Sequence, residues 1–234
     1  MTRSPLMIPT HLRSGATRRG LLGLLLGASL VAAAPGAYAQ KAAPAAATAQ
    51  AGSPSALVLD NSTRVLSTLE ARRNEFTKNR AALRQFIAGE FNQMFDRDYA
   101  ARLVLGTHGR GASDADVKLF ADALTDNLMQ RYGSSLLDFN TRLKVRVKSE
   151  TPMRNGAIVK VDTELLRQGG EPVPVSYLMR RSGSGWKVFD VMVEGVSFVQ
   201  TFRSQFDGPL KRKPIAQVAA DLRAGKLQAD AATN

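Results

Sequence analysis

The feature that most constrains the fold is a change in the period of the apolar residues near residue 139. Before this point, large apolar side chains recur at helical spacing, as Val58, Val65, Leu69 and Phe76 do. After it, apolar and polar side chains alternate, which is typical of strands with one buried face. A chain that forms helices first and strands afterwards favours an α+β fold. We therefore expect an α+β domain.

The helical part of the sequence contains one segment with clear signals at both ends. Ser113 and Asp116 have the spacing of a capping box, which begins a helix, and Gly133 is a typical residue to end it. The apolar stripe between them consists of Val117, Phe120, Leu124, Leu128 and Tyr132. A shorter helix is predicted for residues 97–105, because Gly106 and the glycine-rich loop after it end the helical pattern.

An antiparallel meander is predicted for the alternating part of the chain. Glycine-containing turns, such as Asn155-Gly156, separate its segments. The four predicted strands are residues 139–148, 157–166, 173–181 and 186–193. The fourth strand is apolar on both faces, so we expect it to be covered on both sides. Helices that start at Val196 and Pro214 complete the domain.

The ends of the chain differ from this folded region. Residues 1–39 combine a start with four arginines, an apolar run too short for a permanent membrane helix, and a small-residue cleavage site at Ala37 and Ala39. These three features predict a cleaved export signal. The paired Arg18 and Arg19 are compatible with either the general or the twin-arginine export route. The other divisions are residues 40–54, a flexible Ala/Pro-rich tether; 55–226, a single folded domain; and 227–234, a disordered tail.

Charge and export together narrow the range of partners. The chain has a net charge of +12, and removal of the four arginines of the signal leaves +8. Outside the cytoplasm nucleic acid is not an expected partner, so the basic surface favours anionic lipid headgroups or acidic proteins. An excess of Lys and Arg that only aids solubility explains the charge equally well. The chain has no cysteine, which excludes disulfides and thiol catalysis.

Few residues could carry catalysis. His108 is the only histidine beyond the signal and no G-x-S-x-G motif occurs, so neither a metal cluster nor a Ser–His–Asp set is predicted. Asp190 and Glu194 are the carboxylates to consider. Burial in the most apolar strand would raise the pKa of Asp190 and suit it to acid–base chemistry, but a hydrogen-bonded structural carboxylate is the favoured interpretation. A small exported enzyme that uses Asp190 is the alternative.

Two blocks of the sequence resemble the MlaC family, whose members are periplasmic phospholipid-binding components of the Mla transport system and are also known as toluene-tolerance proteins. The blocks are WKVFDVMVEGVSFV (Trp186–Val199) followed by FRSQF (Phe202–Phe206), and ARLVLG (Ala101–Gly106) followed by Phe120 and QRYG (130–133). Their order and spacing both fit the family. The resemblance covers most of residues 58–225.

The resemblance implies a particular fold and function. Helices would pack on a curved four-stranded antiparallel sheet, and C-terminal helices would close an apolar pocket for the acyl tails of a phospholipid. The protein would be a monomeric, non-enzymatic shuttle in the periplasm, with bound phospholipid as cargo and no other cofactor or metal. It would exchange lipid between an inner-membrane ABC transporter complex and an outer-membrane lipoprotein complex, and so help to maintain the lipid asymmetry of the outer membrane.

Elementary energetics indicate what such a pocket requires. Each buried methylene is worth about 0.8 kcal/mol, so two tails of roughly sixteen carbons resist exposure to water by about 25 kcal/mol at most. Long, flexible or aromatic apolar side chains suit a lining that holds them. The candidates on helices are Phe91, Met94, Phe95, Leu103, Val104, Phe120, Leu124 and Leu128. The candidates on the sheet and the helix after it are Val145, Val147, Val159, Val161, Tyr177, Met179, Val191, Val193, Val196, Phe198 and Val199.

Basic residues are the candidates for contact with a headgroup or a partner protein. They are Arg102, Arg142, Lys144, Arg146 and Arg203. The middle three alternate with apolar residues on the first predicted strand, so a solvated strand face explains them equally well. If the basic surface is itself the functional site, the protein is instead an envelope interaction module.

Overall fold

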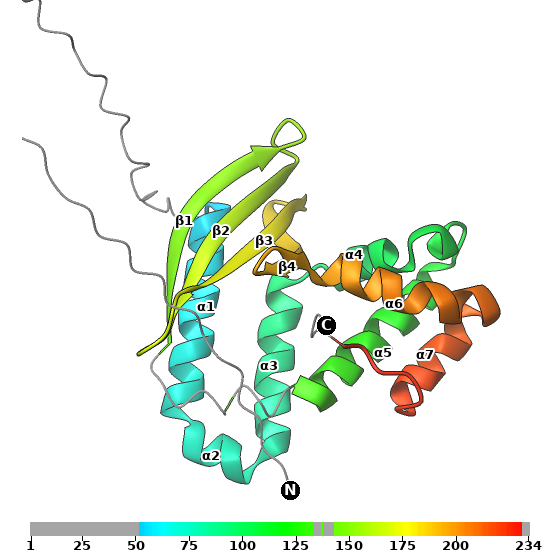
Figure 1. The fold of residues 1–234 in the computed structure, drawn as a ribbon, viewed down its shortest axis with the longest axis horizontal. Coiled ribbons are helices and arrows are strands. Elements are labelled where there is room, and N and C mark those ends of the chain that lie inside the picture. Colours follow the sequence, from blue (N-terminus) through cyan, green and yellow to red (C-terminus); the bar gives the residue numbers. More distant parts are fainter. Residues whose placement is uncertain (1–51, 133–136, 138–142, 231–234) are drawn as a thin grey trace, which may run out of the picture. The chain divides into compact units, whose positions relative to one another are not determined.

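The computed structural model describes residues 52–132, 137 and 143–230, and it shows helices followed by strands, as predicted (Figure 1). The helices before the sheet are α1 (Pro54–Ala71), α2 (Arg73–Lys78), α3 (Arg80–Met94), α4 (Arg97–Leu105), the short 3-10 helix η1 (Gly106–Gly109) and α5 (Asp114–Tyr132). The strands are β1 (Lys144–Met153), β2 (Ile158–Leu166), β3 (Val173–Ser182), β4 (Gly185–Val193) and β5 (Val196–Ser197), followed by α6 (Phe198–Arg212) and α7 (Ile215–Arg223).

The α+β prediction is confirmed, and no helix within these described ranges is long and apolar enough to cross a membrane. The predicted export signal, the tether as far as residue 51 and Arg142 lie outside the described residues.

Side-chain caps fix where several helices begin. Ser113 Oγ accepts a hydrogen bond from the backbone N–H of Asp116 at 3.1 Å and donates to the Asp116 carboxylate at 2.7 Å, so Ser113 caps α5 where the sequence predicts that the helix begins. Asp96 caps α4 in the same way, by accepting from an N–H of its first turn. Ser197 caps α6 by accepting from the N–H of Gln200 at 3.0 Å. These bonds satisfy N–H groups that a helix would otherwise leave unpaired.

The sheet is an antiparallel meander in the order β1-β2-β3-β4-β5. It has five strands rather than the predicted four, because the two residues of β5 pair with the end of β4 through Val196 and Val193. A strand this short leaves no alternation that a sequence pattern can detect. The hairpin predicted at Asn155-Gly156 is confirmed, since both residues have the positive φ that such a turn requires.

The first strand ends later than predicted. The alternation predicts a strand over residues 139–148, of which 139–142 lie outside the described residues, whereas β1 covers Lys144–Met153. A β-bulge between Val147 and Ser149 inserts an extra residue and disturbs the alternation, which hides the rest of the strand from a period-two pattern. Pairing with β2 nevertheless continues as far as Met153, opposite Ile158.

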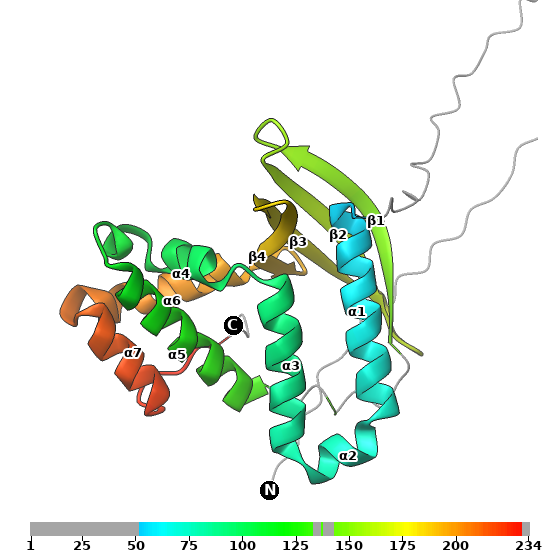
Figure 2. The same ribbon diagram turned by 180° about the vertical axis from the view of Figure 1, so that it is seen from behind.

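One face of the sheet packs on α1, which lies alongside β1 and β2 in both views (Figures 1 and 2). Val58 of α1 is completely buried in a core that contains Val161 of β2, Met179 of β3 and Val188 of β4. Full burial of such a side chain contributes about 1.5–3 kcal/mol. The alternation of the sheet residues therefore reflects burial against α1.

The fourth strand is covered on both sides, as predicted. Val188 faces the core shared with α1. A second β-bulge lies at Phe189. Val188 pairs with Met179 of β3 and Asp190 pairs with Leu178, which leaves Phe189 between them as the extra residue. The ring of Phe189 meets the ring of α4 residue Tyr99 edge-on, with the centroids 5.2 Å apart.

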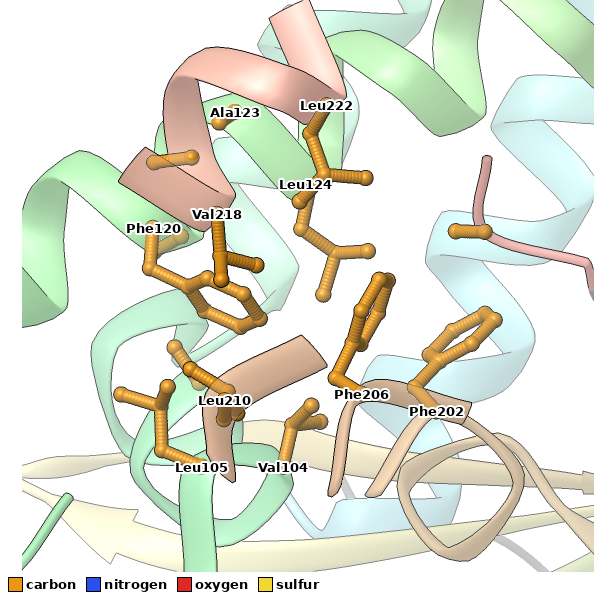
Figure 3. Packing of buried hydrophobic residues seen from close by; sticks show 14 of the residues in the cluster. Val104, Leu105, Phe120, Ala123, Leu124, Phe202, Phe206, Leu210, Val218 and Leu222 are labelled. Carbon is orange, nitrogen blue, oxygen red and sulfur yellow. The ribbon is translucent and has the colours of Figure 1, made fainter. Parts of the chain in front are cut away.

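A second hydrophobic core lies among α4, α5, α6 and α7 (Figure 3). At its centre the rings of Phe120 and Phe206 are perpendicular, with centroids 5.5 Å apart. Val218 and Leu222 of α7 are completely buried against them. This helical core and the sheet core share no residue, so they are two separate clusters.

The C-terminal segment corrects one prediction. Residues 227–234 are predicted to be disordered, but Ala229 is completely buried in the helical core, and its N–H donates to the side chain of Asn127 at 2.9 Å. Composition does not reveal this packing, because much of it is made by the backbone of residues 227–230. Residues 231–234 lie outside the described residues.

Candidate functional site

An apolar pocket of about 400 Å³ lies between the sheet core and the helical core. Its volume falls in the range of about 300–1,000 Å³ that is typical of small-molecule pockets. Apolar side chains dominate its wall, which takes residues from α3, α4, α5, β4 and α6. The lining consists of Phe91, Phe95, Arg97, Ala100, Ala101, Val104, Ala121, Leu124, Thr125, Leu128, Met129, Tyr132, Phe189, Asp190, Val191, Phe198, Val199 and Phe202.

Helical spacing explains why these residues share one space. Leu124 and Leu128 of α5 are four residues apart and lie on the same face, as do Phe198 and Phe202 of α6. On α4 the wall includes Ala101, which is only 2% exposed. Its small side chain leaves room that a larger residue would occupy.

The structure brings eight of the predicted lining residues together around this pocket. They are Phe91, Phe95, Val104, Leu124, Leu128, Val191, Phe198 and Val199. They come from α3 and its C-terminal end, α4, α5, β4 and α6, and are spread over residues 91–199. Their common position makes them the part of the predicted set that a bound molecule could contact.

The other predicted lining residues lie elsewhere. Met94, Val147, Val159, Val161, Tyr177 and Met179 pack in or against the sheet core that faces α1. Phe120 is completely buried in the helical core. Leu103, Val145, Val193 and Val196 are partly buried outside the pocket wall. Periodicity identified the buried faces correctly, but it does not distinguish a solid core from a cavity.

Several pocket residues are absent from the predicted lining. The largest are Phe189, Phe202, Met129 and Tyr132. A signal existed for Phe202, because it follows Phe198 by one helical turn and belongs to the same apolar stripe. Strand alternation also offered a signal for Phe189, because it lies two residues before Val191 on the predicted fourth strand and so shares its face.

Asp190 lies on the pocket wall but serves to anchor α6. One carboxylate oxygen accepts a hydrogen bond from the Ser197 hydroxyl at 2.6 Å, and the other accepts from the backbone N–H of Val199 at 3.0 Å. Burial raises the pKa of Asp190, and these hydrogen bonds oppose the rise. The spacing of Asp190 and Ser197 in the sequence block therefore reflects the hydrogen bond that connects the end of β4 to the start of α6.

The cation on the pocket wall is Arg97, at the start of α4. Its guanidinium forms an ion pair with Asp122 of α5 at 3.2 Å, and Asp122 also accepts from Lys118 at 3.1 Å. The Arg97 side chain is 25% exposed, so it remains accessible to solvent. This pair links α4 and α5 beside the apolar wall.

None of the predicted headgroup residues in the described ranges lines the pocket. Arg102 forms an ion pair with Asp114, and Arg146 shares Glu164 with Lys148 on the exposed face of the hairpin. Lys144 is exposed at the start of β1, and Arg203 is exposed on α6. The Arg203 guanidinium packs over Gly106, whose φ of 56° favours glycine.

The remaining polar cluster offers no obvious catalytic set. His108 Nε2 lies 3.0 Å from an oxygen of Asp207, which also pairs with Lys211 at 2.6 Å. Hydrogen bonds from Lys211 and His108 lower the pKa of Asp207. Among the described residues, no three His, Asp or Glu side chains are grouped so that they could hold a metal ion.

Three comparisons relate the chain to known proteins. The family model described as MlaC protein matches residues 59–224. The toluene tolerance protein ttg2D of Pseudomonas putida is 26% identical over 196 residues, which cover 83% of this chain and 83% of that protein. The intermembrane phospholipid transport system binding protein MlaC of Haemophilus influenzae is 22% identical over 166 residues, which cover 70% of this chain and 77% of its own length.

The structural comparison agrees with the family match. A phospholipid-binding protein from Ralstonia solanacearum, solved in complex with a phospholipid, shares the fold with a TM-score of 0.65 and 21% sequence identity. The likeness covers 73% of this chain and 97% of that chain. The family model spans well over half of the sequence and includes both blocks that carry the resemblance. This chain therefore belongs to the MlaC family.

Proposed function

We propose that this protein binds a phospholipid with its acyl tails in the apolar pocket and carries it through the periplasm. The observation that carries the proposal is the predominantly apolar pocket of about 400 Å³ in a chain of the MlaC family. Two relatives support the choice of cargo. The Haemophilus influenzae protein is named for intermembrane phospholipid transport, and the Ralstonia solanacearum protein holds a phospholipid.

The residues on the wall divide into tail and headgroup contacts. We assign the tails to the eight predicted residues on the wall, together with Phe189 and Phe202. Arg97 is the residue best suited to an anionic phosphate, because it is a cation among the residues that line the pocket. Arg102 and Arg203 lie outside the wall and are better placed for contact with a partner protein.

The proposed partners are Mla-type complexes in the two membranes. An inner-membrane ABC transporter complex and an outer-membrane lipoprotein complex would exchange lipid with this monomeric carrier and so maintain lipid asymmetry. The predicted export signal and the name of the Haemophilus influenzae relative support this placement. Transfer needs only a difference in affinity for the lipid at each membrane.

The bonds of Asp190 support a carrier rather than an exported enzyme. Both oxygens of Asp190 accept hydrogen bonds from the start of α6, so a structural role accounts for this carboxylate. Lipid transfer requires no covalent step and so assigns no catalytic role to this carboxylate.

Filling the pocket tests the proposal. Ala100 lines the pocket, and the Ala100→Trp variant should block part of the tail site. Displacing two methylenes at about 0.8 kcal/mol each should lower lipid retention more than tenfold. Retention is measured as pyrene-labelled phosphatidylglycerol that stays with the protein after gel filtration.

A matched control separates this effect from a general effect of a new indole. The Ala81→Trp variant places the same side chain at an exposed position of α3, away from the pocket wall, and should retain lipid as the wild type does. Equal retention by all three proteins would show that the lipid binds elsewhere. Retention by none of them would refute the proposed function.

A further inference from the structure

The segment after α7 connects two helices that line the pocket. Figures 1 and 2 show the chain returning from α7 along α5. We name residues 227–230 the C-terminal strap. Ala229 of the strap is completely buried in the helical core, together with Phe202 and Phe206 of α6. The strap is thus in contact with the layer that forms one side of the pocket.

The side chain of Asn127 of α5 holds one end of the strap by hydrogen bonds to the backbone of the strap. The Asn127 side chain is nearly inaccessible, and its amide nitrogen donates to the carbonyl oxygens of Leu222 at 2.9 Å and Leu227 at 3.2 Å. Its oxygen accepts from the N–H of Ala229 at 2.9 Å. A buried amide with three partners is costly to leave unpaired, so Asn127 specifies the position of the strap.

Gln205 of α6 holds the other end. Its amide nitrogen donates to the carbonyl oxygen of Asp230 at 2.7 Å, and its amide oxygen accepts from the N–H of Asp230 at 3.1 Å. The Asp230 carboxylate turns back to α5, where it accepts from the Tyr132 hydroxyl at 2.8 Å and pairs with Arg131 at 2.8 Å. Asp230 therefore bridges α5 and α6.

The bridge crosses a seam that lies next to the pocket. The backbone of α5 packs mainly on α4 and α7, whereas that of α6 packs mainly on α4, β4 and η1. Between α5 and α6 lie pocket residues from each helix, such as Leu128 and Phe202. Tyr132 belongs to both features, because it lines the pocket and donates to Asp230.

A seam of this kind has to widen if the protein carries a phospholipid. The pocket of about 400 Å³ is in the lower half of the range for small-molecule sites. A lipid with two long tails is larger than most such molecules. Detaching the strap would expose Ala229 and exchange the strap's hydrogen bonds for bonds to water, a local opening that costs less than unfolding the helices on either side.

We propose that the C-terminal strap ties α5 to α6 beside the bound lipid and that its release opens the pocket for lipid to enter and leave. Asn127 and Gln205 are positioning residues, since they act on the lipid through the strap. The inference rests on the proposed function, because it concerns the same pocket. It assigns to residues 227–230 the control of the rate at which lipid is exchanged.

The Gln205→Ala variant tests this control. It removes both hydrogen bonds to the Asp230 backbone and leaves the pocket wall unchanged. The Gln200→Ala variant makes the same change at an exposed position of the same helix and is the control. The measured quantity is the rate at which pyrene-labelled phosphatidylglycerol leaves the loaded, full-length protein for excess phosphatidylethanolamine–phosphatidylglycerol vesicles.

Loss of the two bonds should speed lipid release about fivefold to tenfold in Gln205→Ala, while Gln200→Ala should match the wild type. Hydrogen exchange of residues 227–230 should speed up in Gln205→Ala in parallel, with the α5 amides near Phe120 unchanged. Faster exchange of the strap without faster release of lipid would overturn the inference. A wild type that holds no lipid at all would instead refute the proposed function.

A second variant displaces the strap more fully. Ala229→Glu places a charge at a completely buried position and should expel the strap from the helical core. Release of lipid should be faster still than in Gln205→Ala, with the helical circular dichroism retained. Release at the wild-type rate from a folded Ala229→Glu protein would contradict the role of the strap, and Gln205→Ala decides the question if Ala229→Glu does not fold.

Discussion

Asp190 shows how one residue of the family block contributes to the fold. Its carboxylate accepts from Ser197 and from the N–H of Val199, so it joins the end of β4 to the start of α6. The Asp190→Ala variant would leave that hydroxyl and that N–H without their partner. We expect a loss of about 1–3 kcal/mol in the free energy of unfolding, measured by urea denaturation.

The exposed Asp126 of α5 provides the matched control for this change. The Asp126→Ala variant should alter the free energy of unfolding by no more than about 0.5 kcal/mol. If Asp190→Ala were as stable as Asp126→Ala, the hydrogen bonds of Asp190 would not hold the helix. The exported-enzyme alternative would then regain support.

Single residues were predictable where their role depends on local spacing. Ser113 and Asp116 form the expected contact at the start of α5 because both partners lie within one turn. Val161 faces a core, as its alternation indicates, but that core is the one against α1. Phe189 lies on the other side of β4 from Val188 and lines the pocket, whereas Val188 packs in the sheet core. Local spacing carries no information about such long-range choices.

At the scale of elements, Asp162 links three strands of the sheet. It belongs to β2, and its carboxylate accepts from Ser149 of β1 at 3.0 Å and from Ser176 of β3 at 2.5 Å, while Lys160 pairs with it at 3.0 Å. Burial alone would raise the pKa of Asp162. The hydrogen bonds from Ser176, Lys160 and Ser149 more than offset that effect, so the pKa is lowered.

This lowered pKa predicts a pH-dependent contribution to stability. Because the unfolded chain binds the proton more tightly, the contribution is present above the ordinary pKa of 3.8 and is lost as the pH falls through the folded value. The Asp162→Asn variant should therefore be less stable than the wild type by about 1 kcal/mol at pH 7, with the difference shrinking below pH 3.8. Urea titrations at pH 7 and at acidic pH measure it. A difference that stayed constant, or grew, in acid would contradict this account of Asp162.

The elements themselves were largely predictable. The helix at residues 97–105 and the second, third and fourth strands match their predicted positions to within one residue, because caps and turns bound them. The first strand and β5 differ for physical reasons, which are a bulge and a length of two residues. The C-terminal strap was missed because Asn127 and Gln205 recognise its backbone, which every sequence shares.

At the scale of the whole molecule, the existence of the pocket depends on how two cores are arranged. The sheet core and the helical core are each predictable from periodicity. The space between them is set by the contacts of β4 with α4 and α6, and no single segment encodes it. The family resemblance implied a pocket, whereas the residue pattern alone was equally consistent with a solid core.

The central claim is that this pocket holds a phospholipid. Native mass spectrometry of the exported protein, purified without added lipid or detergent, tests it most directly. We predict that the wild type and Ala81→Trp carry the added mass of an intact two-tailed phospholipid, and that Ala100→Trp carries far less. The mass of the bare mature chain in all three spectra, or equal lipid occupancy in Ala100→Trp and the wild type, would contradict the claim.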